Sequence, residues 1–445
     1  MKIYNYLLTA VLAIAMFAAC TPAGEETAEK VTLVPSSETI EGDGVDVVTF
    51  TVLSGETDVT AEAKVFKASD NTELVNKSFS TDIPGEYEFY ATYGVIASDN
   101  VKVTALEGAT ISTDKAIIVA NGEDQAVLTV TQEGQDVTAE STFYLLQEDG
   151  ESVQLESNVF TTTEVGQHQI YAKKGTASSA PVAILATAYD NEPSNFNFRE
   201  RAMLLQFTAQ GCGYCPLMKK GLMILHEQGW DDGISVACHV GFMQDSMYPT
   251  FWNALWRNYG AGATGIPAMS FNLDTETGTG AYANATATAT NLKQITSDVI
   301  NKYPVTAGIS ATFLPEGDSQ MKVTATFKAS EAGDYKVAAW LLEDHIDGVQ
   351  SDYNNVLTAE QKRDHCDVLR AVSNQDDFTG DVLNIGAGES VEKSWTFNVS
   401  SLKEGVIENA HVVVFITKKE ANGLYIVNNI INCNMNDSVG FEYVE

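Results

Sequence analysis

From about Val31 to Ala188, short runs alternate apolar and polar residues and are broken by glycine, aspartate, asparagine and serine. A two-residue alternation of this kind predicts β-strands that bury one face. The segment has no convincing helical period, in which apolar residues recur every three or four positions. We therefore expect this part of the chain to be all-β.

Two motifs in this segment occur twice at nearly equal spacings. Asp58–Glu62 returns as Asp136–Glu140, and the pattern of Gly85–Ala91 returns as Gly166–Ala172. Such self-similarity indicates a tandem duplication, and each copy has the length of a small immunoglobulin-like β-sandwich. The expected sandwiches span residues 31–106 and 107–188. Neither contains a cysteine, and their expected role is that of a spacer or binding module.

After a polar linker at 190–195, strand and helix patterns alternate. Arg201–Phe207 reads as a buried strand, and apolar residues at helical spacing follow Cys215 until Gly229. The later predicted elements are a strand at Ile234–Val240, a helix at Thr250–Tyr259, a strand after Pro267 and a helix at Ala285–Lys302. This alternation predicts an α/β domain over residues 196–303.

The rest of the chain returns to strand patterns. Alternation is clear in Val305–Phe313 and in Met321–Phe327. Further strands are predicted at Tyr335–Leu342, Val391–Val399, His411–Thr417 and Tyr425–Asn432. We expect a C-terminal β-sandwich over residues 304–445, which makes the chain multidomain.

The N-terminus carries an export pattern. The apolar run Leu7–Phe17 is too short to cross a hydrocarbon layer of ~30 Å but suits a secretory signal. Small residues before Cys20 resemble the bacterial lipoprotein signal, which implies cleavage after residue 19 and a lipid on Cys20. Residues 20–30 would then form a tether. An ordinary signal peptide with an incidental cysteine is the alternative.

Charge narrows the possible partners. The 445 residues include 60 acidic and 26 basic side chains, a formal net charge of -34. A field of this sign repels nucleic acid and anionic lipid, so we expect no nucleic-acid partner. Membrane attachment would depend on the N-terminal lipid anchor and not on a basic patch.

Cys212 and Cys215 are the main candidates for chemistry, because they lie between a predicted strand and a predicted helix. A thiol at a helix start ionises below the ~8.5 of a free cysteine. Cys212 would attack a substrate disulfide, and Cys215 would resolve the mixed disulfide. This reading expects Cys212 to be exposed and Cys215 to be more buried.

A purely structural disulfide is the main alternative, since an exported protein meets an oxidising compartment. A zinc site is less favoured, because no second Cys-x-x-Cys pair exists and Cys238, His226 and His239 lack a standard ligand spacing. We expect no metal and no other cofactor.

Three further cysteines follow the dithiol pair. Cys238 is in an apolar strand and reads as a buried thiol, whereas Cys366 and Cys433 could form a disulfide. His365-Cys366-Asp367 is a weak candidate for metal binding.

The order of strand, Cys-Gly-Tyr-Cys helix, strand, helix and proline-led strand resembles the thioredoxin fold. The resemblance implies that Ile266-Pro267 is a cis bond beside the dithiol and that the backbone at Ile266 pairs with an extended substrate. Gly213 and Tyr214 would also contact substrate. The chain departs from thioredoxin at Gly211, where thioredoxin has tryptophan, and lacks the acid of the preceding strand.

The segment Thr208–Pro216, together with Gly265–Pro267, Leu341–Asp344 and Val368–Arg370, resembles the 28-kilodalton outer-membrane protein family of Bacteroidetes-type bacteria. The resemblance spans Phe196 to Glu445 and implies an outer-membrane lipoprotein with a thioredoxin-like domain, facing the periplasm or the exterior.

Two functional hypotheses result. The first is thiol-disulfide exchange, with the thiols or disulfides of exported or surface proteins as partners. The second is a non-catalytic surface binding protein or adhesin that holds an envelope or extracellular ligand and has a structural disulfide.

Overall fold

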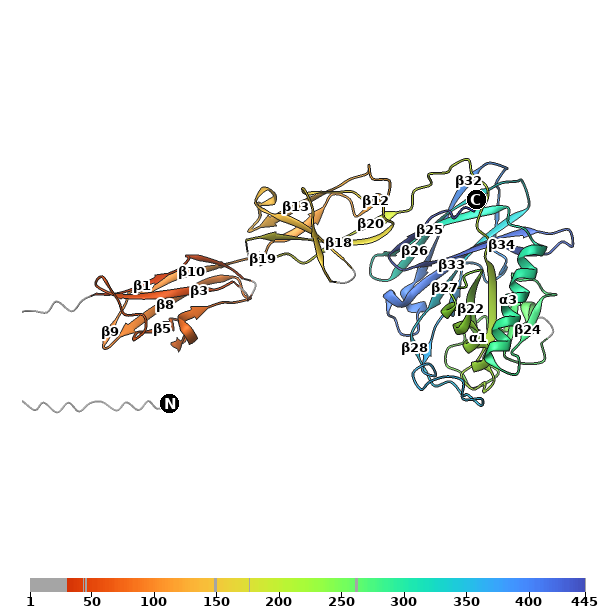
Figure 1. Cartoon of the computed structure of the whole chain (residues 1–445), viewed down its shortest axis with the longest axis horizontal. Helices are drawn as coiled ribbons and strands as arrows, with labels where there is room; N and C mark the ends of the chain where they lie inside the picture. Colours follow the sequence, from red (N-terminus) through yellow and green to blue (C-terminus); the bar gives the residue numbers. More distant parts are fainter. Residues whose placement is uncertain are drawn as a thin grey trace, which may run out of the picture. The chain divides into compact units, whose positions relative to one another are not determined.

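The computed structural model describes residues 30–42, 44, 46–147, 150–175, 177–260 and 263–444. The expected signal peptide and Cys20 lie outside these residues. The described chain is mostly β-sheet and contains two compact units, the first built on residues 30–109 (Figure 1). None of its helices is long and apolar enough to cross a membrane.

The first expected sandwich span folds as two facing sheets. One has the order β1-β3-β4 with β7 on β3, and the other has the order β2-β10-β8-β5-β6 with β9 on β8. Alternate residues of β3 point into the core. Among them, Phe50 contacts Phe89 of β8, with 4.8 Å between the two ring centroids. The strands are β1 Val31–Pro35, β2 Thr39–Glu41, β3 Val48–Ser54, β4 Thr57–Asp58, β5 Lys64–Lys67, β6 Thr72–Glu73, β7 Ser78–Phe79, β8 Gly85–Tyr93, β9 Ile96–Ala97 and β10 Val101–Leu106.

The second expected sandwich span repeats this topology. Its sheets are β11-β13-β14 with β17 and β12-β20-β18-β15-β16 with β19, and β12 pairs with β20 in parallel as β2 pairs with β10. The duplication read from two short motifs therefore extends to the strand order. The strands are β11 Thr110–Thr113, β12 Ile117–Val119, β13 Ala126–Gln132, β14 Gln135–Asp136, β15 Thr142–Leu146, β16 Ser152–Gln154, β17 Val159–Phe160, β18 Gly166–Lys174, β19 Ala177–Ser178 and β20 Val182–Thr187.

The repeated Asp-Val-Thr-Ala-Glu motif has a structural role in both copies. The carboxylate of Asp58 accepts the backbone N–H of Thr60 at 2.8 Å, and that of Asp136 accepts the N–H of Thr138 at 2.9 Å. The hydroxyl of Thr60 in turn accepts the backbone N–H of Val52 in β3, and the hydroxyl of Thr138 accepts that of Val130 in β13. These local bonds fix a turn, which explains why the motif is repeated.

The larger body is built on a mixed sheet with the order β24-β23-β21-β22-β30-β27-β33-β34, and β31 pairs with β27. Strands β21 and β22 are parallel, whereas β23 is antiparallel to β21. Helices α1 and α3 pack side by side on one face, against Leu204 and Phe271, and α2 packs on the other face with Phe207 (Figure 1). The elements are β21 Ala202–Thr208, α1 Cys215–Glu227, β22 Gly233–His239, α2 Trp252–Tyr259, β23 Ala268–Phe271, β24 Gly278–Gly280 and α3 Ala285–Lys302.

The predicted boundary between residues 303 and 304 implied a separate C-terminal domain. In the structure the C-terminal strands instead share a sheet with the α/β part. Strand β30 pairs with β22 in parallel, and β27, β33 and β34 continue the same sheet, while a second sheet β32-β26-β25-β35 covers their other face. These strands are β25 Ala307–Glu316, β26 Gln320–Ala329, β27 Tyr335–Glu343, β28 Ile346–Asp347, β29 Asp364–His365, β30 Val368–Val372, β31 Asp381–Leu383, β32 Ser390–Asn398, β33 Ala410–Lys419, β34 Tyr425–Asn434 and β35 Asp437–Val439.

The physical reason for this difference is two-sided burial. Along β27, Ala338, Trp340 and Leu342 join the apolar cluster of the α/β part, whereas Val337 and Leu341 face the second sheet. A strand that is apolar on both faces requires a layer on each side. The C-terminal sandwich therefore shares one of its two sheets with the α/β part.

Candidate functional site

Cys212 and Cys215 form a disulfide with an S–S distance of 2.09 Å. Cys212 lies in the turn that follows β21, and Cys215 is the first residue of α1. No side chain caps this helix, and its first turn contains no acidic residue. The positive end of the helix dipole thus lies at Cys215, with no carboxylate in the first helical turn to offset it.

The Ile266–Pro267 segment lies close to the disulfide in the fold. Its peptide bond is cis, and Ala268, the next residue, pairs with Phe207 near the end of β21. Ile266 is half-buried and packs against the apolar cluster that contains both cysteines. The structure therefore brings together the two segments that the resemblance to thioredoxin had linked.

Both cysteines are buried, so the expectation of an exposed Cys212 was wrong. Cys212 is 3% exposed and Cys215 is 1% exposed. The cause is a segment between β28 and β29 that crosses the disulfide turn. The backbone N–H of Tyr353 donates to the carbonyl of Gly213 at 2.9 Å, and a Cβ at Gly213 would come within 2.4 Å of the Tyr353 ring.

Gln350 attaches the same segment to the turn. Its side-chain amide donates to the carbonyl of Ala209 at 3.0 Å and to that of Cys212 at 2.9 Å. The backbone N–H of Ser351 donates to the carbonyl of Gln210 at 2.8 Å. We call residues 348–353 the cover segment. It satisfies buried carbonyl groups that would otherwise lack donors, which explains why it lies closely against the turn.

A buried ion pair supports the turn from the other side. His239, at the end of β22, places Nδ1 2.7 Å from Oδ2 of Asp245, and the same oxygen accepts the backbone N–H of Gln210 at 2.7 Å. Burial alone would raise the pKa of Asp245, but the hydrogen bond and charge of His239 hold it below its usual value. The sequence analysis did not identify this pair, which fixes Asp245 against the backbone of Gln210 in the disulfide turn.

A cavity of about 730 Å³ lies beside the disulfide and reaches Cys215. Its wall on α1 includes Lys219, whose ammonium group donates to the carbonyl oxygens of Gln361 and Asp364. Burial lowers the pKa of Lys219. His239 also lines the cavity, as do Leu222 and Trp230, so the disulfide borders a space with both polar and apolar walls.

The three remaining cysteines of the described chain are free thiols. Cys238 is buried, as predicted, and burial raises its pKa. Cys433 is also buried, whereas Cys366 is exposed, so the possible disulfide between them is not formed. Desolvation at its sulfur and the nearby carboxylates of Asp344 and Asp364 nevertheless raise the pKa of Cys366 to about 12, which makes it a poor nucleophile at neutral pH.

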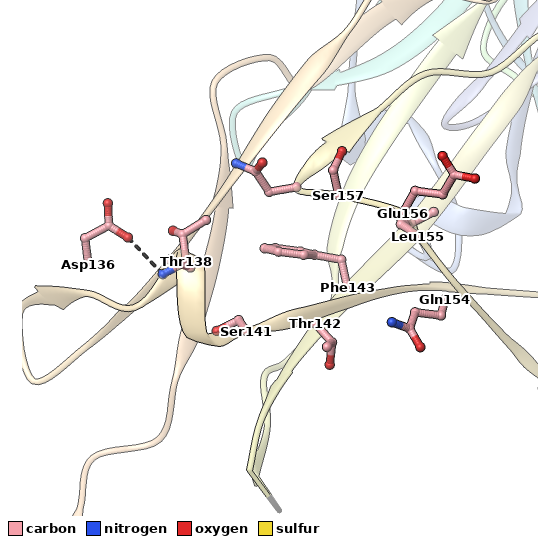
Figure 2. Close-up of a pocket in the computed structure, with 11 residues that line it drawn as sticks. Asp136, Thr138, Ser141, Thr142, Phe143, Gln154, Leu155, Glu156 and Ser157 are labelled. Atoms are coloured by element: carbon pink, nitrogen blue, oxygen red, sulfur yellow. Dashed lines mark hydrogen bonds between the residues drawn. The ribbon is translucent and has the colours of Figure 1, made fainter.

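A second pocket, of about 590 Å³, lies on the second sandwich (Figure 2). Figure 2 shows the Asp136 carboxylate hydrogen-bonded to the backbone of Thr138, so this carboxylate stabilises the local turn. Phe143 also lines the pocket, and the lining residues include neither cysteine nor histidine. This pocket therefore offers no group for thiol chemistry.

The family model of outer membrane protein Omp28 matches residues 253–437. These residues run from α2 to β35 and thus resemble a family of outer-membrane proteins. The match includes the cis proline segment but not Cys212 and Cys215, which had been the most specific part of the expected resemblance. No curated protein matches the chain.

Solved structures show weak likenesses. HBP35 of Porphyromonas gingivalis is 17% identical, with 54% of this chain and 77% of that chain covered and a TM-score of 0.43. A structural-genomics target from Agrobacterium tumefaciens is 13% identical, with 55% and 97% covered and a TM-score of 0.36. A C-terminal fragment of intimin, solved with the intimin-binding domain of its receptor, is 14% identical, with 43% and 71% covered and a TM-score of 0.23. At these TM-scores the likenesses carry no argument about function.

Proposed function

We propose that the protein catalyses thiol-disulfide exchange through a thioredoxin-like part that contains Cys212 and Cys215. The observation that carries the proposal is the placement of this pair at the uncapped start of α1, directly after the central strand β21. The chain order β21-α1-β22-α2-β23, with Pro267 directly before β23, supports the proposal because the resemblance to thioredoxin rests on this order of elements.

In the proposed reaction the reduced protein attacks with the Cys212 thiolate. The attack breaks a substrate disulfide, forms a mixed disulfide with one substrate sulfur and releases the other as a thiol after protonation. The Cys215 thiolate then attacks the Cys212 sulfur, which releases the second substrate thiol and forms the Cys212–Cys215 disulfide. Two electrons pass from the protein to the substrate. In this proposal His239 and Asp245, which are hydrogen-bonded to each other beside the turn, accept or return the protons.

A polypeptide is the substrate class that the surface near the turn favours. Five large apolar or aromatic side chains from three loops are exposed: Tyr214, Phe242, Tyr248, Val349 and Tyr353. Exposed apolar groups of this kind mark interaction surfaces for protein segments. In this proposal the backbone at Ile266 pairs with an extended substrate, and Gly213 and Tyr214 contact the same substrate.

The reaction requires that the cover segment move. Tyr353 itself is 69% exposed and has few ties, namely the backbone hydrogen bond to Gly213 and an edge contact with the Tyr214 ring at 5.4 Å between centroids. Uncovering the turn would also break the hydrogen bonds of Gln350 and Ser351, which lie in the same loop between β28 and β29.

The proposed location is the outer membrane, through a lipid on Cys20. The lipoprotein pattern before Cys20 and the match to an outer-membrane protein family support this location. The two sandwiches, proposed to be immunoglobulin-like, would act as a spacer between the anchor and the redox part.

Reduction of a disulfide-containing test protein by dithiothreitol tests the proposed activity. The mature chain is expected to accelerate the reaction, and Cys212→Ser is expected to abolish the acceleration. Cys366→Ser is the matched control and should retain full activity, because that thiol is outside the proposed mechanism. Equal rates with the original chain and with Cys212→Ser would refute the proposal.

Burial of both sulfur atoms favours a second candidate, a non-catalytic surface binding protein in which the disulfide is structural. The pocket on the second sandwich would then be the first place to seek a ligand. Under this alternative, Cys212→Ser lowers the thermal stability of the protein, and no variant shows exchange activity.

A further inference from the structure

Three side chains from separate segments converge on one wall of the cavity. Asp344 follows β27, Asp367 precedes β30, and His411 is near the start of β33. Nε2 of His411 lies 3.2 Å from Oδ1 of Asp344 and 3.8 Å from Oδ1 of Asp367. One nitrogen and two carboxylate oxygens, all within 4.8 Å of one another, therefore face a common point.

The orientation of His411 is fixed by its other ring nitrogen. His411 is 4% exposed, and its Nδ1 lies 2.6 Å from the amide oxygen of Asn432. Because an amide oxygen can only accept, Nδ1 carries the proton, and in the neutral ring Nε2 keeps its lone pair. Nε2 is buried and makes no hydrogen bond of good geometry, although Oδ1 of Asp344 lies 3.2 Å away. Ligand histidines in metal sites show this arrangement, with the second nitrogen held by an oxygen.

Backbone hydrogen bonds hold the Asp344 carboxylate and the loop that carries Asp367. The N–H of Asp367 donates to Oδ1 of Asp344 at 2.7 Å, which ties the two loops together. The carbonyl of Asp367 accepts the N–H of Ala237 at 2.8 Å and thereby fixes its loop to β22. The loops that carry Asp344 and Asp367 are thus fixed to each other and to β22, and His411 lies within β33.

We propose that Asp344, Asp367 and His411 bind a divalent transition metal ion such as zinc or manganese. A tetrahedral zinc ion with bonds of ~2.1 Å keeps its ligand atoms roughly 3.4 Å apart. The Nε2 atom of His411 lies 3.2 Å from the Asp344 oxygen and 3.8 Å from the Asp367 oxygen, which brackets this value. One imidazole and two carboxylates are a usual donor set for such ions. Three protein ligands leave a position open toward the cavity, where water or a small anionic ligand can bind.

The sequence analysis expected no metal because it examined residues close together in the chain. Asp344, Asp367 and His411 have no recognisable ligand spacing, and β-sheet pairing alone brings them together. The proposed site goes beyond thiol exchange and does not depend on it, since neither Cys212 nor Cys215 takes part.

A neighbouring cluster supplies a matched control. His345, Asp364 and Cys366 also lie within reach of one another, but they are more exposed. Their polar atoms already pair, with Nδ1 of His345 3.0 Å from Oδ1 of Asp364 and the Cys366 sulfur 3.7 Å from the same oxygen. This second cluster therefore has no buried ligand atom without a well-formed hydrogen bond, unlike Nε2 of His411.

Titration calorimetry with zinc and with manganese tests the site on the full mature chain, treated with chelator and kept oxidised. We expect one bound ion per chain, an affinity at least tenfold lower in Asp344→Asn and in His411→Ala, and unchanged affinity in His345→Ala and Cys366→Ser. No binding by the original chain would overturn the proposal, as would a loss of binding in either control variant.

Cobalt binding provides a test that needs no substitution at the buried histidine. The original chain should bind cobalt with a visible ligand-field spectrum that lacks a thiolate-to-metal charge-transfer band, because the proposed ligands are oxygen and nitrogen. A charge-transfer band would place the ion on Cys366 and overturn the assignment. Competition between cobalt and zinc for one equivalent would support it.

Discussion

Because Gly213 has no Cβ, the Tyr353 ring can lie directly against the disulfide turn. The Tyr353 ring occupies the space that a Cβ at this position would need. The backbone N–H of Tyr353 then bonds to the Gly213 carbonyl, which places the ring over the turn between the two cysteines. Tyr353 therefore contributes to the cover over the turn, in addition to the apolar residues that pack around Cys212, and its contribution can be tested by substitution.

Tyr353→Ala should speed the reduction of the disulfide by dithiothreitol. The expected increase is about tenfold, the factor that corresponds to ~1.4 kcal/mol of local opening free energy that the variant no longer needs. The rate is followed by alkylation of the released thiols and mass measurement. Tyr282→Ala, at an exposed aromatic residue of another loop, is the control. An unchanged rate in Tyr353→Ala would show that the ring does not limit access.

Glu200 makes stability depend on pH. Burial raises the pKa of this carboxyl from 4.5 to about 8, and one of its oxygens has no hydrogen-bond partner. Between these values the unfolded chain is ionised while the folded chain holds the proton, so stability falls as pH rises through the window.

Glu200→Gln should remove this pH dependence. Allowing for the partial exposure of Glu200, we expect stabilisation on the order of 2 kcal/mol at pH 8 and almost none near pH 4.5. Urea unfolding of both proteins at the two pH values measures the difference. The prediction fails if the variant gains as much at the lower pH as at the higher one.

Local sequence could predict only part of the candidate site. Cys212, Cys215 and Pro267 stand out because a motif or a strand start marks each of them. Gln350 and Tyr353 could not be found in this way, since they reach the disulfide turn through tertiary contacts over more than a hundred positions. The same holds for His411, whose role depends on sheet pairing and not on its neighbours in the chain.

At the scale of elements, long periodic segments were predictable and short ones were not. The helix Ala285–Lys302 begins and ends where its pattern and Pro304 place it, and the strands at Ala202–Thr208 and Gly233–His239 differ by one residue from expectation. Strands such as β24 and β35 were missed because three residues carry too little pattern. The unbroken apolar run of β33 was a usable signal of two-sided burial.

The shared sheet predicts that residues 196–303 do not fold alone. Cutting the chain after 303 removes Trp340, Leu369 and Phe415 from the apolar cluster around β21 and β22. Each such side chain contributes roughly 1.5–3 kcal/mol, and a domain has only ~5–15 kcal/mol in total. Circular dichroism should show no cooperative thermal transition for 196–303, whereas 196–444 should show one. A cooperative transition in the shorter piece would restore the predicted boundary.

At the scale of the whole molecule, composition and repeats predicted the broad plan. The tandem sandwiches and a later α/β part followed from a change in periodicity. The resemblance to an outer-membrane protein family rested on motifs between residues 208 and 370, and the family model matches residues 253–437. The fusion of the α/β part with the C-terminal strands was not foreseen. Each half, taken alone, has a pattern compatible with an independent domain.

The most direct test of the proposed activity is to trap its intermediate on the mature chain. Cys215→Ala, reduced and then mixed with a peptide disulfide, should hold one peptide as a mixed disulfide on Cys212, because the resolving thiol is missing. Peptide mapping by mass spectrometry locates the adduct. The account predicts modification at Cys212 and little at Cys366. An unmodified Cys212, or an adduct confined to Cys366, would contradict it.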